Sequence, residues 1–370
     1  MKEFFSTYKI TLETRGPLYI GSGRELGKKE FIYNRKSRKI LIPDLTKMYH
    51  SLQEKNLARA YENYLLDQRE KDLYTWLNRK GITYDIYKNW TGYILDCSDA
   101  VLDKNTKNLS LFMKDAYGKP YVPGSSLKGA LRTILFCDEL RNDQLKCKKI
   151  QDEIRKGMKY SRQGRNFLQK ESSNIEVEVF HTCDIDTKYV PKRHALQDHM
   201  KGVIISDSYP IDSKNLVLCQ KIDVDVHGKE KVMPILRECI KPGTKIEFEM
   251  TIDENVIQYY DIGILEAVNR FLKCYQSYLK HFGKVEEEQD ILYLGGSVGF
   301  VSKTILYSLF SEKEAVQITS DIFDKTLSDR IKREHHHERD IRLGVSPHIK
   351  KCTRYAGKQY EFGRCKIYIE

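Results

Sequence analysis

Residues 120–133 read PYVPGSSLKGALRT and carry the strongest structural signal in this chain. Its Pro-Gly turn leads into apolar residues at helical spacing, so we expect a helix with Ser125 as its N-cap. Lys128 and Arg132 lie four residues apart and share the polar face of that helix. A helix start with free backbone amides and nearby cations is a ready site for a phosphate group. An ordinary capped helix with a solvated basic face remains the alternative.

Strand and turn patterns occur on both sides of this helix. Residues 8–14 alternate apolar and polar side chains, which predicts a half-buried strand, and a segment with three glycines follows at 16–23. Further strand patterns occur at 203–208 and 240–248, and a glycine-rich segment occupies 294–303. These segments lie on both sides of the central helix in the sequence.

The sequence of this central stretch resembles the PGSSLKGALR motif of the RAMP superfamily of CRISPR-associated proteins. The strand and glycine segments named above are similar to other landmarks of that family, and they occur in the same order over roughly residues 8 to 305. The tail at 341–348 and 360–367, together with the length of 370 residues, resembles the fifth subunit of type III-A (Csm) effector complexes. The neighbouring type III-B family shares these motifs, and the tail favours type III-A over it.

The order of elements predicts an α+β fold. Strand, helix, strand, strand, helix and strand are expected near 8–20, 125–140, 202–208, 245–252, 261–281 and 298–309, the βαββαβ order of a ferredoxin-like, RRM-type fold. The resemblance implies the same RAMP core, which we expect to span 1–310. We expect a helical insertion at about 44–90 in which Asp44 caps the first helix, a basic loop at about 150–200, and a C-terminal extension at 311–370. A second, degenerate RRM-like lobe is an additional hypothesis, without a boundary.

Composition favours a polyanionic partner in the cytoplasm. Lys and Arg outnumber Asp and Glu by 63 to 52, which gives a formal net charge of +11. The nine cysteines lack a close Cys-x-x-Cys pair, as expected for reduced thiols in a cytosolic protein. No stretch approaches the roughly 20 apolar residues of a membrane span, so we expect no membrane partner.

The resemblance and the local chemistry together select candidate RNA-binding residues. Glycines permit close approach of the backbone to a ligand, and their amides can form an anion-binding nest. A tight turn or a flexible hairpin loop explains the same glycines, and a solvated loop explains the basic residues near 160. The candidates are Gly21, Ser22, Arg24, Ser125, Ser126, Lys128, Arg132, Arg162, Arg165, Gly295, Gly296, Ser297, Gly299 and Lys303.

The sequence argues against catalysis and against a metal or other cofactor. Backbone subunits of the resembled complex cut RNA with an aspartate after their first strand, whereas residues 26–34 here contain no aspartate and Glu30 is a poor substitute. The histidines show no recognisable acid–base pattern. The run His335-His336-His337-Glu338 has no second half-site at zinc spacing, and adjacent histidines cannot easily face one ion.

The resemblance therefore implies a non-catalytic, RNA-binding subunit used in antiviral defence. It would cap the end of the complex that holds the 3′ part of the CRISPR RNA (crRNA), and contact a backbone RAMP subunit and a small helical subunit. It would also aid trimming of the RNA 3′ end, by recruiting host nucleases or by shielding against them. Two alternatives remain open: a metal-independent crRNA-processing endoribonuclease, and a protein scaffold with incidental RNA contact.

Overall fold

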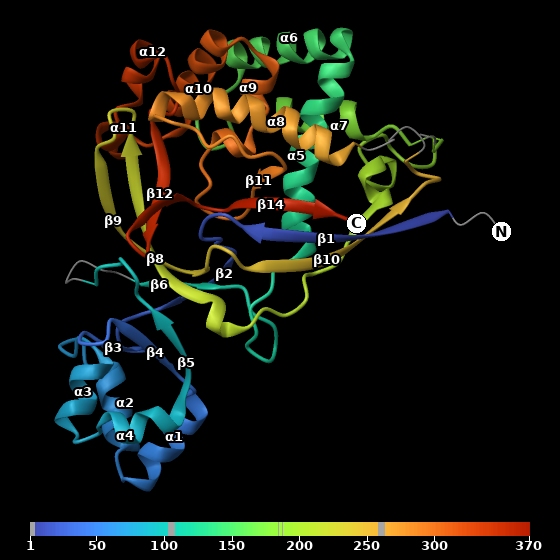
Figure 1. The fold of residues 1–370 in the computed structure, drawn as a ribbon. Helices are drawn as coiled ribbons and strands as arrows, with labels where there is room; N and C mark the ends of the chain where they lie inside the picture. The colour runs from blue at the N-terminus through green and yellow to red at the C-terminus, as the bar shows by residue number, and fades with distance from the viewer. Residues whose placement is uncertain (1–3, 103–107, 184, 187, 258–262) are drawn as a thin grey trace.

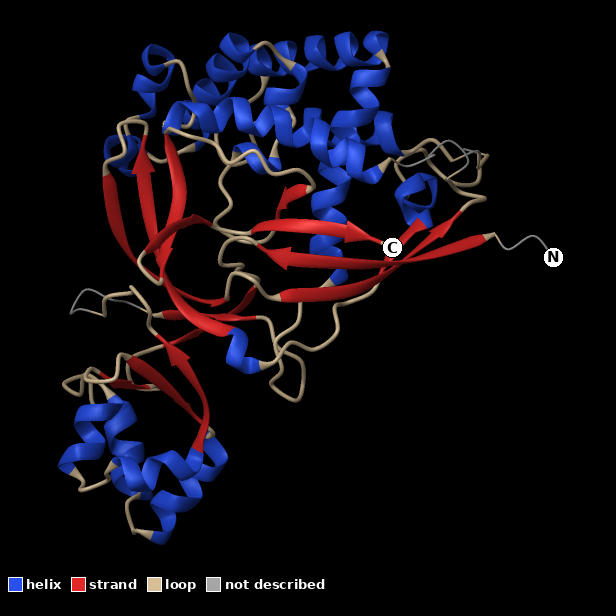
Figure 2. Ribbon diagram, in the orientation of Figure 1, coloured by secondary structure: helices blue, strands red, loops and turns tan. Residues whose placement is uncertain are grey.

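A computed structural model describes residues 4–102, 108–183, 185–186, 188–257 and 263–370. Two sheets curl beneath a layer of helices, and a smaller helical group lies apart from that layer (Figures 1 and 2). The expected α+β class is confirmed. No helix in the described ranges has the length and apolar character to cross a membrane.

The first sheet contains both ends of the described chain. Its five strands run in the order β11 (Ile291–Tyr293), β14 (Arg364–Ile369), β1 (Phe5–Thr14), β10 (Lys245–Asp253) and β7 (Val203–Ile205), and every neighbouring pair is antiparallel. Successive side chains of a strand point to opposite faces of the sheet, and the alternating apolar residues decide which face is buried. Ile10 and Leu12 of β1 and Phe248 of β10 are fully buried and pack into the main core.

Two long helices complete that core. They are α5 (Gly124–Asn142) and α8 (Ile264–Leu279), which pack against each other and place Leu127 and Val268 in the same core as the first sheet. Both helices lie where the apolar periodicity predicts them.

The second sheet is larger and mixed. Its main path is β2 (Gly21–Leu26), β6 (Leu109–Phe112), β9 (Glu230–Ile240), β8 (Leu216–Asp225), β5 (Thr91–Asp96), β4 (Lys39–Pro43) and β3 (Ile32–Asn34). β12 (Ile349–Tyr355) pairs with β8 and with β13 (Lys358–Glu361). A bridge between Leu18 and Ile240 connects the chain after β1 to this sheet.

The helical group between β4 and β5 has a core of its own. It comprises α1 (Leu45–Glu54), α2 (Ala58–Leu66), α3 (Leu73–Arg79), α4 (Tyr84–Tyr87) and η1 (Lys88–Trp90). The rings of Tyr61, Tyr64 and Trp76 pack together in its centre. Asp44 caps α1 by accepting a hydrogen bond of 3.1 Å from the Lys47 amide, which confirms the expected cap.

Part of the segment expected as a basic loop is helical. α6 (Gln144–Tyr160) and α7 (Gln169–Phe180) bury Ile150, Ile154, Ile175 and Val179, which lie four residues apart within each helix. The expectation of a loop was wrong here because the charged residues occupy the exposed faces of amphipathic helices. The short helices η2 (Ala195–Gln197), η3 (His199–Gly202), η4 (Ser213–Asn215) and η5 (Lys280–Phe282) complete the middle of the chain.

The strand expected at 298–309 was also wrong. The segment forms η6 (Val301–Lys303) and α9 (Leu306–Leu309), since a short apolar run fits a helix face as well as a strand. The tail at 311–370 supplies β14, a central strand, instead. Before β12 it forms α10 (Glu312–Thr326), α11 (Asp329–His335), η7 (His337–Arg339) and α12 (Asp340–Leu343).

Candidate nucleic-acid interface

The start of α5 is closed by a carboxylate. The helix begins at Gly124 after Pro123, and no side chain of the cap residue holds its amides, so the expectation that Ser125 is the N-cap was wrong. Instead, the Gly124 amide donates to Asp207 Oδ1 over 2.8 Å, and a negative charge there complements the helix dipole. A Cβ on Gly124 would lie 2.2 Å from the Ile205 carbonyl oxygen, so the turn packs directly on the end of β7.

The two candidate cations on α5, Lys128 and Arg132, are both held by neighbouring groups. Lys128 Nζ donates to the Val203 carbonyl over 2.7 Å, and burial lowers the pKa of its ammonium. Arg132 Nη1 donates to Asp198 Oδ2 over 2.8 Å, and its guanidinium lies 3.8 Å from the ring centre of Phe180. A guanidinium has five donors, so Arg132 keeps donors for a further ligand.

Three of the candidate cations meet in one groove. Arg132 of α5, Arg165 before α7 and Lys303 at the end of η6 line a groove of about 550 Å³. We call it the basic groove. Its apolar lining comes from residues on the surrounding helices and loops, chiefly Phe136, Ile154, Phe167, Phe180, Phe300 and Ile322.

Lys303 is the most informative member of the basic groove. Within the described part of the chain, its ammonium has no hydrogen-bond or ion-pair partner, and desolvation by the surrounding atoms lowers its pKa. Lys303 and Arg165 are both exposed side chains, and Arg165 is equally without a partner in the described ranges. A cation without a counter-charge is stabilised by an anion that enters the groove.

The groove offers little for acid–base chemistry. Among the described residues that line it there is no histidine and no aspartate, and its acidic members are Glu171 and Glu176. Glu171 accepts a hydrogen bond of 2.7 Å from the Ser161 hydroxyl. The arrangement therefore suits binding of a phosphate backbone along a surface. Gln169, Ser172 and Thr304 are further polar groups of the lining, and no sequence motif marks them.

The two glycine-rich segments, 16–23 and 294–303, contact each other. The Gly296 amide donates to the Tyr19 carbonyl over 2.8 Å, and a Cβ on Gly295 would lie 2.3 Å from that same oxygen. A Cβ on Gly21 would lie 2.7 Å from the Tyr19 hydroxyl. Close packing of the chain on itself therefore explains these glycines, and their contact with RNA stays a prediction.

The other candidates lie outside the groove lining. Ser22 and Arg24 stand on the edge strand β2, where the Ser22 hydroxyl donates to the Leu111 carbonyl over 3.2 Å. Ser297 and Gly299 have φ values of 68° and 90°, which shape the turn into η6. The lining also lacks Gly21, Ser125, Ser126, Lys128, Arg162, Gly295 and Gly296.

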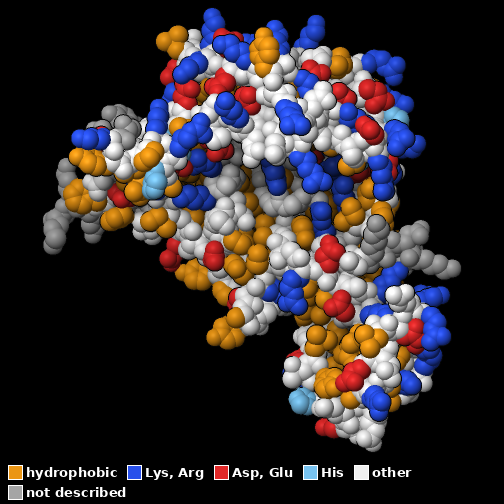
Figure 3. Space-filling model, turned by 180° about the vertical axis from the view of Figure 1, so that it is seen from behind, with side chains coloured by type: hydrophobic (Ala, Val, Ile, Leu, Met, Phe, Trp, Pro, Cys, Tyr) orange, Lys and Arg blue, Asp and Glu red, His pale blue; other side chains and the backbone are white. Residues whose placement is uncertain are grey.

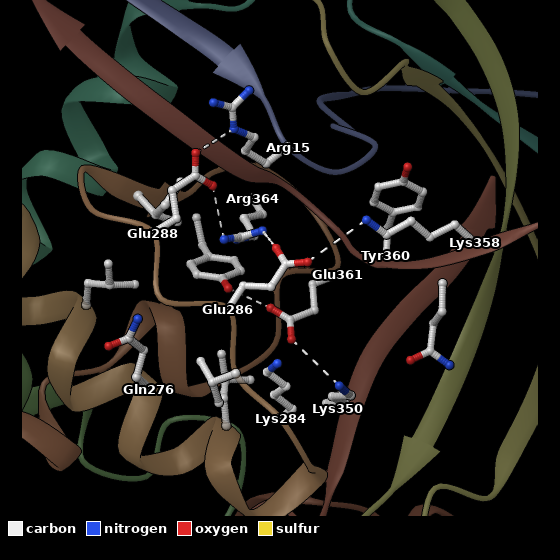
Figure 4. A pocket seen from close by; sticks show the side chains of 16 residues that line it. Arg15, Gln276, Lys284, Glu286, Glu288, Lys350, Lys358, Tyr360, Glu361 and Arg364 are labelled. Atoms are coloured by element: carbon white, nitrogen blue, oxygen red, sulfur yellow. Dashed lines mark hydrogen bonds and ion pairs between the residues drawn. The ribbon is translucent and has the colours of Figure 1, made fainter. Parts of the chain in front are cut away.

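A second cavity, of about 170 Å³, is lined by charged side chains that pair with one another. Figure 4 shows its charged side chains facing one another between α8, β11, β13 and β14. Arg15 donates to Glu288 over 2.8 Å, Arg364 bridges Glu286 and Glu288, and the Tyr293 hydroxyl donates to Glu361 over 2.6 Å. This network fixes the sheet, whereas the basic groove keeps unpaired positive charge.

Figure 3 shows one face of the molecule, on which Lys and Arg side chains lie among Asp and Glu side chains over the helical layer, and further Lys and Arg side chains lie in the hollow beneath it. Positive charge of this kind attracts a nucleic-acid backbone through release of its counterions.

The chain belongs to the RAMP superfamily, whose family model matches residues 11–300. A protein of Streptococcus thermophilus named CRISPR system Cms protein Csm5 is 31% identical over 323 residues, 82% of each chain. Proteins of the same name from Enterococcus italicus and Mycobacterium tuberculosis are 29% and 25% identical, with 85% and 100% of this chain covered and 84% and 99% of theirs. Within the superfamily, the chain therefore belongs with the Csm5 proteins.

Two solved structures share the fold. The crystal structure of Csm5 from T. onnurineus has a TM-score of 0.65 at 18% identity, over 96% of this chain and 99% of the other. A chain in a cryo-EM structure of a type III-A Csm–crRNA–target RNA ternary complex has a TM-score of 0.65 at 16% identity, over 98% of this chain and 100% of the other.

Proposed function

We propose that this chain is a non-catalytic, RNA-binding subunit of a type III-A CRISPR (Csm) complex, with the crRNA backbone in the basic groove. The observation that carries this proposal is the unpaired ammonium of Lys303 beside Arg165 and Arg132. The names of the relatives support the choice of complex, and the ternary complex that contains a structural neighbour supports crRNA and other Csm subunits as partners.

The position within the complex is part of the same proposal. The resemblance to Csm5 supports a subunit that caps the end holding the crRNA 3′ part, next to a backbone RAMP subunit and a small helical subunit. It also supports a cytoplasmic location and a role in 3′-end maturation together with host nucleases.

We further infer a ferredoxin-like core. β1 and β7 run parallel on either side of β10, and β14 runs parallel to β10 on the far side of β1. α5 follows β1 in the chain and α8 follows β10, so the two halves form interleaved β-α-β units. β14 takes the place of the fourth strand. The second, nine-stranded sheet is where a degenerate second lobe would lie.

The test is fluorescence anisotropy of a labelled single-stranded RNA with the purified chain across a salt series. Lys303→Ala/Arg165→Ala removes two groove cations, so the slope of log affinity against log salt should fall by roughly 1.4, at about 0.7 per contact. The matched control Arg59→Ala/Lys80→Ala removes two exposed cations of the helical group and should leave the slope unchanged.

The same samples separate the alternatives. A denaturing gel should show intact RNA, whereas shortened RNA would favour the endoribonuclease. Equal slopes for wild type and the groove variant would reject the groove as the RNA site. If partner subunits then still assembled with the variant, the scaffold function would be favoured.

A further inference from the structure

Three side chains that the RNA-binding proposal does not use converge near the end of the helical layer. They are His337 of η7, Asp340 at the start of α12, and His348, which directly precedes β12. One potential ligand atom from each lies within 4.8 Å of the other two. Asp340 is fully buried, and the side chains of His337 and His348 are only 13% and 11% exposed.

The carboxylate of Asp340 is the centre of this cluster. Its Oδ2 lies 3.1 Å from His337 Nδ1, and its Oδ1 contacts His348 Nδ1. The Ser346 hydroxyl donates to Oδ2 over 2.6 Å and fixes the direction of the carboxylate. Two imidazoles and one carboxylate therefore face one small volume.

An outer layer of contacts holds the three groups in place. The Tyr307 hydroxyl donates to the Ser346 carbonyl over 2.7 Å and accepts from the Ser346 amide over 3.2 Å. The ring of Phe323 lies 4.5 Å from that of His337. Supporting hydrogen bonds of this kind orient metal ligands and raise affinity for the ion.

The backbone explains why His337 joins the cluster and its neighbour His336 does not. His336 has a φ of 55° and ends α11 in the left-handed region, so the chain changes direction there. The His336 ring turns to Glu338, 3.0 Å away, whereas His337 turns inward. The second half-site that sequence spacing does not show is supplied by Asp340 and His348, from the two segments that follow.

We propose that His337, Asp340 and His348 bind one divalent transition-metal ion of the Zn²⁺ class. Two imidazole nitrogens and a carboxylate oxygen form a donor set that Zn²⁺ and similar ions accept, with a fourth position for water or a partner's side chain. Ligands about 2.0–2.2 Å from a tetrahedral ion lie about 3.3 Å apart, close to the 3.1 Å between His337 and Asp340. The ion would tie η7 and α12 to the start of β12.

The competing explanation is a buried hydrogen-bond cluster without a metal, and direct binding separates the two. The full chain, purified without a histidine tag and dialysed against a chelator, is titrated with Zn²⁺ by calorimetry and with Co²⁺ by visible absorption. The wild type should bind one equivalent of Zn²⁺ and give the intense visible band of four-coordinate Co²⁺. Absence of both signals would overturn the proposal.

Variants assign the site. His337→Gln and His348→Gln should weaken Zn²⁺ binding by about tenfold or more, while the matched control His336→Gln should retain wild-type affinity. Ser346→Ala leaves all three ligands in place and should weaken binding by about 10–100-fold through loss of the oriented carboxylate. It therefore tests the site even if a histidine variant does not fold. Wild-type affinity in Ser346→Ala and in the folded histidine variants, or equal loss in His336→Gln, would place the ion elsewhere and refute the assignment.

Discussion

Gly295 and Gly299 provide a matched pair for deciding what the glycine segment does. Both have positive φ, 86° and 90°, but a Cβ on Gly295 would lie 2.3 Å from the Tyr19 carbonyl oxygen, while a Cβ on Gly299 would meet nothing within 4 Å. Gly299→Ala should therefore cost only the left-handed backbone, about 1–2 kcal/mol. Gly295→Ala adds the overlap with Tyr19, about 1–3 kcal/mol more, for a total of about 2–5 kcal/mol.

The assay is urea unfolding of both variants and the wild type, followed by far-UV circular dichroism. The difference between the two variants isolates the steric contact, because the backbone cost is common to both. Equal destabilisation would refute the argument that the segment is glycine-rich so that it can pack on Tyr19. RNA anisotropy on folded Gly299→Ala then tests whether this turn also binds RNA. Unchanged affinity for RNA is expected if the basic groove, rather than this turn, holds the RNA backbone.

Three further predictions concern buried polar groups. Lys114→Met should destabilise the protein by about 3–5 kcal/mol in urea unfolding, because it leaves the fully buried Glu238 without its cation. The double variant Lys114→Met/Glu238→Gln should regain most of this loss. A double variant as unstable as Lys114→Met would contradict the pairing. Tyr64→Phe should be neutral or raise the free energy of unfolding by about 1 kcal/mol, because the buried Tyr64 hydroxyl has no hydrogen-bond partner in the described chain, so a clear loss would show a hidden partner. Burial lowers the pKa of His199 below the usual value near 6.5. The contribution of His199 to the free energy of unfolding is therefore present above that pH and is lost as the pH falls towards the folded pKa. Urea unfolding at about pH 7 and about pH 5.5 should show this loss in the wild type and a smaller loss in His199→Gln.

The sequence predicted the central elements well because their signals are local. The apolar period of α5 and α8 and the alternation in β1 depend only on neighbouring residues, so each element appears where the pattern places it. The cap of α5 was missed because Asp207, which holds the first amide, is 83 positions away from Gly124. No helix-start rule that uses adjacent residues can identify such a partner.

The candidate site was predicted residue by residue but not as a unit. Lys303 and Arg132 were both chosen from the sequence, yet nothing in their spacing shows that they share a groove with Arg165. The convergence of His337 and His348 was missed for a similar reason, since it depends on the left-handed turn at His336. Tertiary packing, and not residue type, creates both arrangements.

The pairing of β1 with β14 has a consequence for biosynthesis. Thr14 and Cys365 are partners in that ladder, so at about 5–20 residues per second a ribosome needs roughly 20–70 seconds to make the second after the first. β10 can protect one edge of β1 earlier, but the other edge stays open until β14 emerges. A nascent chain stalled before residue 364 would present an unpaired strand edge to other chains, the kind of edge that promotes aggregation. Protection of this edge of β1 during translation therefore waits for β14.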